Sequence, residues 1–155
     1  MSKKVLFVCT GNTCRSSMAE ALARQMLARG SAGRAIEVFS AGLAAAPGSP
    51  ASSAAVETLA ELGIDLRKHR ASRLTAEMAG QADLVLTMTG AQKEQVRKMV
   101  PGARVKTLAE YAGRGTDITD PVGQPLAVYR RCAAQLKEMV GLALRKLAEE
   151  MNINK

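Results

Sequence analysis

The stretch from Val5 to Ser17 constrains the fold more than any other part of this chain. It begins with the apolar, β-prone run Val5 to Cys9 and turns at Gly11-Asn12. It then continues into Met18 to Ala23, a run of residues with strong helix propensity. This order predicts a strand, a tight loop and the N-terminus of a helix.

The loop carries two reactive side chains, Cys9 at its start and Arg15 six positions later. A loop that curls over a helix N-terminus aims several backbone N–H groups at one point, where the helix dipole adds partial positive charge. We expect an oxyanion to bind there, with the planar guanidinium of Arg15 holding two of its oxygens. The same field favours the thiolate of Cys9. A nucleophilic sulfur beneath a phosphate-sized site predicts phosphoryl transfer through a cysteinyl-phosphate.

The octet from Cys9 to Ser16 reads Cys-Thr-Gly-Asn-Thr-Cys-Arg-Ser and contains the Cys-x5-Arg-Ser spacing of cysteine-based phosphatases. Directly after a first strand, it resembles the low-molecular-weight protein tyrosine phosphatase family, which includes bacterial protein arginine phosphatases. The resemblance covers essentially the whole chain and implies phosphorylated proteins as substrates. It also implies that the phosphate site is formed by Thr10, Gly11, Asn12, Thr13, Cys14 and Ser16.

A leaving group on phosphorus needs a proton donor opposite the nucleophile. The loop Gly113 to Gly123 supplies two carboxylates, Asp117 and Asp120. The resemblance implies that the general acid is Asp120, the aspartate of an Asp-Pro pair. Pro121 restricts Asp120 to an extended backbone, which can hold its carboxyl group over the phosphate site. We expect Asp117 to hydrogen-bond the loop instead.

Supporting contacts around the sulfur also follow from the resemblance. Ser40-Ala41-Gly42 matches a triplet that ends the second strand in the family, so Ser40 is expected to hydrogen-bond the phosphate loop while Asn12 holds its strained turn. Ser16 is expected to hydrogen-bond the sulfur and stabilise the thiolate. His69 matches a histidine with a structural role in the family, and we favour that role over a general base acting on Cys9.

The remainder of the chain predicts a three-layer α/β fold. Apolar strand-like runs alternate with amphipathic helical segments, which indicates a parallel sheet with right-handed crossovers. Four strands in the order 2-1-3-4, flanked by helices in a flavodoxin- or Rossmann-like arrangement, would place the ligand at the carboxyl end of the first strand. The expected strands are 4–9, 35–40, 82–88 and 104–108; the expected helices are 16–29, one beginning at Ser49-Pro50 and ending at Gly63, one capped at Thr75, and the segments 90–100, 108–111 and 125–151.

Composition narrows the remaining function classes. The chain has 155 residues, which suits one phosphatase domain over residues 1–155, and we expect a monomer. No apolar run approaches the roughly 20 residues that cross a bilayer, and Met1-Ser-Lys-Lys is not a signal peptide, so we expect a cytoplasmic protein without a membrane partner. Three cysteines without a Cys-x2-Cys pair and one histidine predict no metal site, and no cofactor is expected. The net charge of +8 is dispersed without aromatic interleaving, which makes nucleic acid an unlikely partner.

Thr13 bears on the substrate. The resemblance implies a bulky aliphatic residue at this position in tyrosine-specific members and threonine in arginine phosphatases. Tyrosine-specific members also place aromatic residues after the Asp-Pro pair, where this chain has Val122 and Gly123. Arginine phosphatases tend to have phenylalanine there, so Val122 departs from both patterns. We therefore favour phosphoarginine, with phosphotyrosine as the alternative.

The cysteines leave one role open for Cys14, and two other functions are alternatives to hydrolysis. Cys14, in the same loop as Cys9, is either a redox partner that captures oxidised Cys9 as a disulfide or a small packing side chain. An arsenate reductase shares this fold and loop but needs further relay cysteines, and Cys132 on the last helix has no suitable partner. A non-catalytic phosphate-binding module should lack the nucleophile or the acid, whereas Cys9 and Asp120 are both present.

Overall fold

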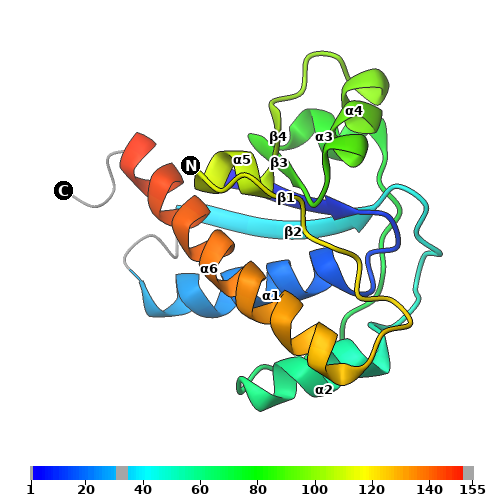
Figure 1. Cartoon of the computed structure of the whole chain (residues 1–155). Coiled ribbons are helices and arrows are strands. Elements are labelled where there is room, and N and C mark those ends of the chain that lie inside the picture. The colour runs from blue at the N-terminus through cyan, green and yellow to red at the C-terminus, as the bar shows by residue number, and fades with distance from the viewer. Residues whose placement is uncertain (1, 31–34, 152–155) are drawn as a thin grey trace.

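The computed structural model describes residues 2–30 and 35–151, and its centre is a four-stranded, all-parallel sheet (Figure 1). The strand order is β2-β1-β3-β4, which confirms the predicted fold class. Cys9, the last residue of β1, is in register with Gly42, the last residue of β2. The bounds are Lys3–Cys9 for β1, Ile36–Gly42 for β2, Leu84–Thr87 for β3 and Val105–Thr107 for β4.

Helices form a layer on each face of the sheet (Figure 1). The longest helix, α6, packs along α1 and also contacts α2 and α5 on one face, while α4 packs on β3 and β4 from the other. This gives the three predicted layers. The bounds are Arg15–Arg29 for α1, Ser53–Glu61 for α2, Ala76–Gln81 for α3, Gly90–Met99 for α4, Leu108–Ala112 for α5 and Leu126–Glu150 for α6.

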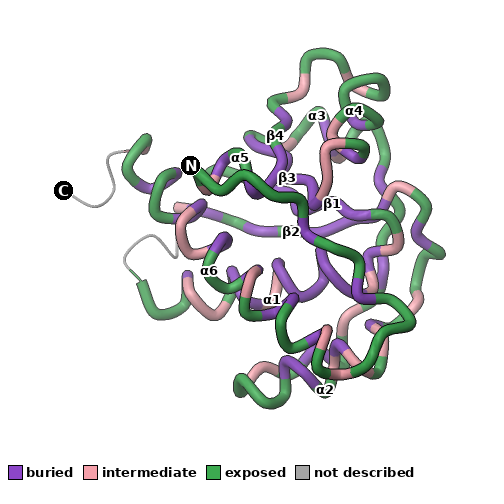
Figure 2. Tube along the Cα trace, viewed as in Figure 1, coloured by how far each residue is buried: buried purple, intermediate pink, exposed green. Residues whose placement is uncertain are grey.

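The alternation of side chains along β1 decides where its last residue points. Val5, Phe7 and Cys9 belong to the larger hydrophobic cluster, which lies between the sheet and the α1–α6 layer. Leu6 and Val8 belong to a smaller cluster beneath α3 and α4. All five are buried, and buried segments dominate the inner faces of the elements in Figure 2. The thiol of Cys9 is therefore directed toward the N-terminal end of α1.

The predicted start of α2 is wrong. Its N-cap is Ser52, whose Oγ accepts a hydrogen bond from the backbone N–H of Ala55. Pro50 instead forms an isolated antiparallel bridge with Arg70. A Ser-Pro pair and a serine two residues later are both good helix-start signals, and here the tertiary pairing of the Pro50 segment selects the later one. The predicted cap of α3, Thr75, is confirmed.

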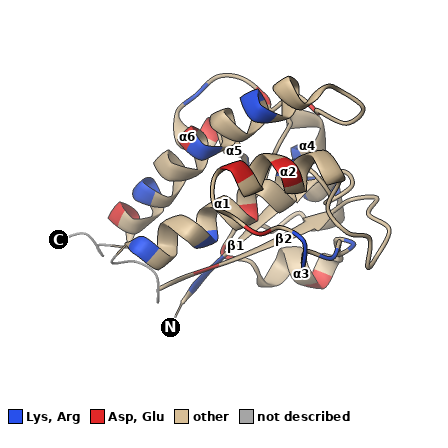
Figure 3. Cartoon of the chain, turned by 90° about the horizontal axis from the view of Figure 1, so that it is seen from below, with Lys and Arg blue, Asp and Glu red and all other residues tan. Residues whose placement is uncertain are grey.

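Charged side chains are distributed over many elements. In Figure 3, lysine and arginine occur on β1, on the helices and in the loops, with acidic residues interspersed among them. Within residues 2–30 and 35–151, none of the helices is both long and apolar enough to cross a membrane.

Candidate active site

The sulfur of Cys9 lies at the junction of β1 and the loop that leads into α1. It is buried, and it accepts a hydrogen bond from the backbone N–H of Asn12 at 3.3 Å. Ser16 Oγ lies 2.8 Å from the sulfur, and it accepts a hydrogen bond from the side-chain amide of Asn12. Because that acceptor position is occupied, the hydroxyl proton of Ser16 is free to donate to the sulfur. Ser16 therefore makes the predicted contact with the sulfur, and its stabilisation of a thiolate stays a prediction.

Asn12 fixes the shape of the loop. It has φ of 58°, the only positive φ at a non-glycine among the described residues, and it is fully buried. Its Nδ2 donates to Ser40 Oγ at 2.9 Å, which confirms the predicted contact of Ser40 with this loop. Its Oδ1 accepts from the backbone N–H of Ser72, and its carbonyl oxygen lies 2.7 Å from His69 Nε2. Asparagine tolerates the left-handed region better than most residues, and these contacts hold it there.

Arg15 connects the loop to the segment that carries the acid. Its guanidinium donates to the carbonyl oxygen of Ile118 at 3.0 Å and lies 3.5 Å from a carboxylate oxygen of Asp120. Ile118 is fully buried and anchors this segment across the mouth of the site. The other carboxylate oxygen of Asp120 accepts from the backbone N–H of Val122. Arg15 therefore brings the Asp120 segment to the N-terminus of α1, directly after the loop that begins at Cys9.

Asp117 has a different position from that of Asp120. Its carboxylate accepts from the backbone N–H of Gly90, at 3.2 and 3.3 Å, at the N-terminus of α4. A carboxylate at that end of a helix is stabilised by the helix dipole. Asp117 thus tethers the 113–125 loop to α4, rather than hydrogen-bonding within the loop as expected.

Gln92 is a supporting residue that sequence reasoning missed. It is buried on α4, and its Oε1 accepts from the backbone N–H groups of Met88 and Thr89. Its Nε2 donates to the hydroxyl of Thr10, the residue that follows Cys9, at 3.1 Å. The sequence signal for it is the capping-box spacing Thr89-x-x-Gln92 at the start of this helix.

Gly42 supports the loop from β2. A Cβ at this position would lie 2.6 Å from the carbonyl oxygen of Thr10 and 2.9 Å from the backbone nitrogen of Asn12. Both atoms belong to the loop backbone and cannot give way without moving the loop. Only glycine allows the end of β2 to approach so closely.

A buried cysteine sulfur, a buried guanidinium and a half-exposed carboxylate near one loop suit phosphoryl transfer. The family model described as low molecular weight phosphotyrosine protein phosphatase matches residues 4–154. This chain belongs to that family. It is accordingly a cysteine-based protein phosphatase, a hydrolase that acts on phosphoproteins.

Relatives of the phosphatase include members with different named specificities. A protein-arginine-phosphatase of Geobacillus stearothermophilus is 41% identical over 153 residues, which is 97% of this chain and 99% of that protein. A probable low molecular weight protein-tyrosine-phosphatase, EpsP of Ralstonia solanacearum, is 38% identical and covers 90% of this chain and 92% of its own length. The crystal structure of a low molecular weight protein tyrosine phosphatase from T. tengcongensis superimposes with a TM-score of 0.88 at 42% identity, covering 94% of this chain and 99% of that one.

The mouth of the phosphatase site contains the two positions that bear on substrate. Thr13 is half-buried in the loop, and its carbonyl oxygen accepts from the backbone N–H of Ser52 at the start of α2. Val122 is 59% exposed, so it contributes little as a fixed wall.

The other two thiols lie in different environments. Cys14 is buried, and its Sγ donates to Ser52 Oγ and lies 3.4 Å from the hydroxyl of Tyr129. Burial, together with the hydrogen bond to Cys14, raises the pKa of Tyr129. Burial raises the pKa of Cys132 to about 12, so this thiol is protonated and unreactive at neutral pH. A disulfide between Cys14 and Cys9 stays a prediction.

Among residues 2–30 and 35–151, there is no group of three or more His, Cys, Asp or Glu side chains arranged to hold a metal ion.

Proposed function

We propose that this phosphatase hydrolyses phosphoarginine in proteins through a cysteinyl-phosphate intermediate. The observation that carries the proposal is Thr13, whose position in the phosphate loop is the one where the resemblance distinguishes arginine from tyrosine phosphatases. Overall identity does not discriminate, because relatives named for arginine and for tyrosine match almost equally well. A threonine leaves room for a branched guanidinium phosphate, which an isoleucine would crowd.

In the first step, the thiolate of Cys9 attacks phosphorus in line with the leaving nitrogen. The S–P bond forms as the P–N bond breaks, while Arg15 and the loop amides hold the three equatorial oxygens. Asp120 donates its proton to the departing nitrogen, so arginine leaves as a guanidinium. The half-exposed carboxylate of Asp120 beside Arg15 supports this role.

In the second step, Asp120 acts as a carboxylate and removes a proton from a water molecule that attacks phosphorus. The S–P bond breaks, inorganic phosphate forms, and the hydroxyl of Ser16 stabilises the returning thiolate. The hydroxyl of Thr13 helps to orient the water. The remaining loop residues, Thr10, Gly11, Asn12 and Cys14, shape the phosphate site, with Ser40 and Asp117 supporting it. A thiolate nucleophile must stay reduced, which fits a cytoplasmic protein, and we propose that it acts as a monomer.

The test compares phosphate release from phosphoarginine and phosphotyrosine peptides by the parent protein, Thr13→Ile and Thr13→Val. We expect the parent to prefer phosphoarginine by at least about tenfold in kcat/KM, and Thr13→Ile to erode that preference. Thr13→Val keeps the size of threonine but lacks the hydroxyl, so it separates crowding from hydrogen bonding. A parent protein that prefers phosphotyrosine would leave the mechanism intact and establish the tyrosine alternative.

A further inference from the structure

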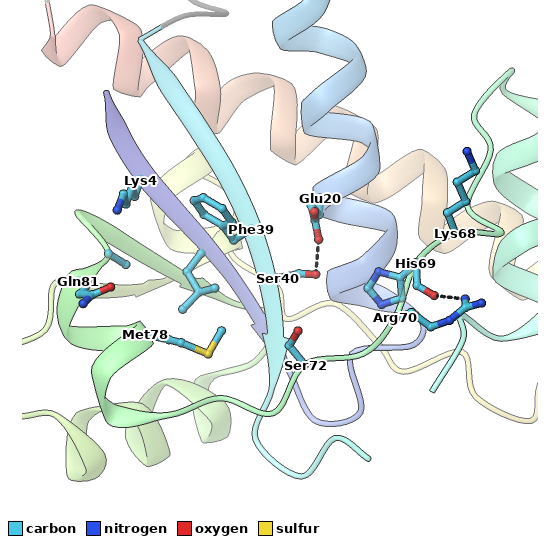
Figure 4. A pocket seen from close by; sticks show the side chains of 12 residues that line it. Lys4, Glu20, Phe39, Ser40, Lys68, His69, Arg70, Ser72, Met78 and Gln81 are labelled. Carbon is cyan, nitrogen blue, oxygen red and sulfur yellow. Dashed lines mark hydrogen bonds between the residues drawn. The ribbon is translucent and has the colours of Figure 1, made fainter. Parts of the chain in front are cut away.

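A cavity follows the edge strand β2 and reaches both faces of the sheet. Phe39 and Met78 line it on the α3 side, and Ser40 and Glu20 line it on the α1 side. Its volume is about 490 Å³, within the range of small-molecule sites. Phe39 of β2 is 42% exposed there, and it is in register with Leu6 of β1, which also lines the cavity. Figure 4 shows Met78 and Gln81 of α3 on the same side of β2 as Phe39, whereas Ser40 points to the other side, toward Glu20.

The charges around this cavity are predominantly positive. Lys4, Lys68 and Arg70 line it, against a single carboxylate, Glu20. Glu20 is already paired with Arg24 and accepts a hydrogen bond from Ser40. Within the described part of the chain, neither lysine forms an ion pair, and the guanidinium of Arg70 bonds only backbone carbonyl oxygens. An apolar floor with unpaired cations at its rim complements a ligand with an aromatic or aliphatic body and an anionic group.

The wall of the cavity is also the back of the phosphate loop. Three residues that line it, Ser40, His69 and Ser72, each hydrogen-bond Asn12, the residue that holds the loop in its left-handed turn. Asn12 and Ser40 are buried, so water reaches these bonds only from the side of His69 and Ser72. A ligand that covers those two residues excludes this water, and hydrogen bonds strengthen where water is excluded. Occupancy of the cavity should therefore stabilise the phosphate-binding conformation of the loop.

We propose that this cavity is an activating site for a small amphipathic anion, coupled to the phosphate site through Asn12. By linkage, the anion and phosphate must each tighten the binding of the other by the same factor. This proposal does not depend on which phosphoprotein is the substrate, because inorganic phosphate reports on the coupling.

The probe is 4-phenylbutyrate, measured by titration calorimetry with and without saturating inorganic phosphate. We expect one site per chain, with a Kd about fivefold tighter in the presence of phosphate. Turnover of p-nitrophenyl phosphate should rise at subsaturating substrate. Binding that weakens as phosphate is added would place the probe in the catalytic loop and overturn the proposal, as would no binding at all. Tightened binding without any change in turnover would overturn the activating role.

Two controls locate the site. Phe39→Glu removes the aromatic wall and adds a charge that repels the anion. It should raise the Kd of the probe by about tenfold or more. Leu62→Glu is the matched control, because Leu62 is 38% exposed, close to the 42% of Phe39, and does not line this cavity. This variant should bind the probe as tightly as the parent does. Uncharged 4-phenylbutanol should bind more weakly than the carboxylate. Equal weakening in both variants would overturn the assignment.

Discussion

The carboxylate of Asp120 lies 3.5 Å from the guanidinium of Arg15, yet the side chains differ greatly in exposure, 50% for the aspartate and 6% for the arginine. The arginine is fixed, because Ile118 holds its guanidinium from the other side. The aspartate, in contrast, remains open to water and to a leaving group. Arg15 is therefore suited to hold an anion, and Asp120 is suited to exchange protons.

Replacing the acid should separate chemistry from binding. In Asp120→Asn, we expect kcat to fall by about 10²- to 10⁴-fold, the usual contribution of a general acid. The affinity for inorganic phosphate should be unchanged or tighter, because a carboxylate beside Arg15 has been removed. Steady-state kinetics and phosphate titration check the two parts. An unchanged kcat would remove Asp120 from the mechanism.

Gly42→Ala should distort the phosphate loop, since the added methyl would meet two of its backbone atoms at less than 3.0 Å. We expect a stability loss of about 1–3 kcal/mol and a larger than tenfold loss in kcat/KM. Gly102→Ala is the matched control, because its Cβ meets nothing within 4 Å. If thermal unfolding and turnover of Gly42→Ala equal those of the control, the close approach has no role.

Gln92 should affect stability and catalysis through different atoms. Gln92→Leu leaves the N–H group of Thr89 unpaired, whereas the N–H of Met88 keeps its bond to the carbonyl oxygen of Val8, and we expect a cost of about 1–3 kcal/mol. Gln92→Glu keeps an acceptor for both groups but removes the donor to Thr10, so its kcat should fall with a smaller loss of stability. Denaturant titration alongside kinetics separates the effects. Equal losses of kcat and stability in both variants would assign Gln92 a purely structural role.

Acid stability should depend on Glu110. Hydrogen bonds from Lys93 and the backbone of Thr107 lower the pKa of Glu110 from 4.5 to about 2. A lowered folded-state pKa stabilises the protein above pH 4.5, and this contribution is lost as pH falls from 4.5 toward 2. Glu110→Gln should therefore cost about 1 kcal/mol at pH 7, given its partial exposure, and nothing near pH 2.

Glu94→Gln is the control for this pH effect. The Glu94–Arg97 pair lies within one helix, and both side chains are more than half exposed. Its removal should change the free energy of unfolding by less than about 0.5 kcal/mol at either pH. A constant difference between Glu110→Gln and the parent across the whole pH range would contradict the linkage.

The sequence predicted the features that depend on local pattern. The apolar runs located four parallel strands, and the alternation of strands and helices led to the observed order. The loop octet also placed Cys9, Arg15 and Ser16 together, because a tight strand–loop–helix unit fixes their geometry within a few residues. Ser40 was found only through the resemblance.

The local sequence pattern could not predict contacts between segments that are distant in the chain. The link from Gln92 to Thr10 joins residues 82 positions apart, and Asn12 and Ser72 are separated by 60. Likewise, the start of α2 depended on the pairing of Pro50 with Arg70, which no local signal reveals. Asp117 was placed in the correct loop but assigned the wrong partner, since Gly90 reaches it only in the folded chain.

The two hydrophobic clusters differ in size, and the catalytic loop depends on both. The larger one secures Cys9 and α1, whereas the smaller one carries α4 and therefore Gln92, which holds Thr10. A layer with less buried apolar surface opens at a lower free energy than the whole domain. On warming, amide hydrogen exchange in α4 should therefore accelerate before that in α6. The enzyme should lose its activity while most of its helical signal remains, so that inactivation precedes unfolding.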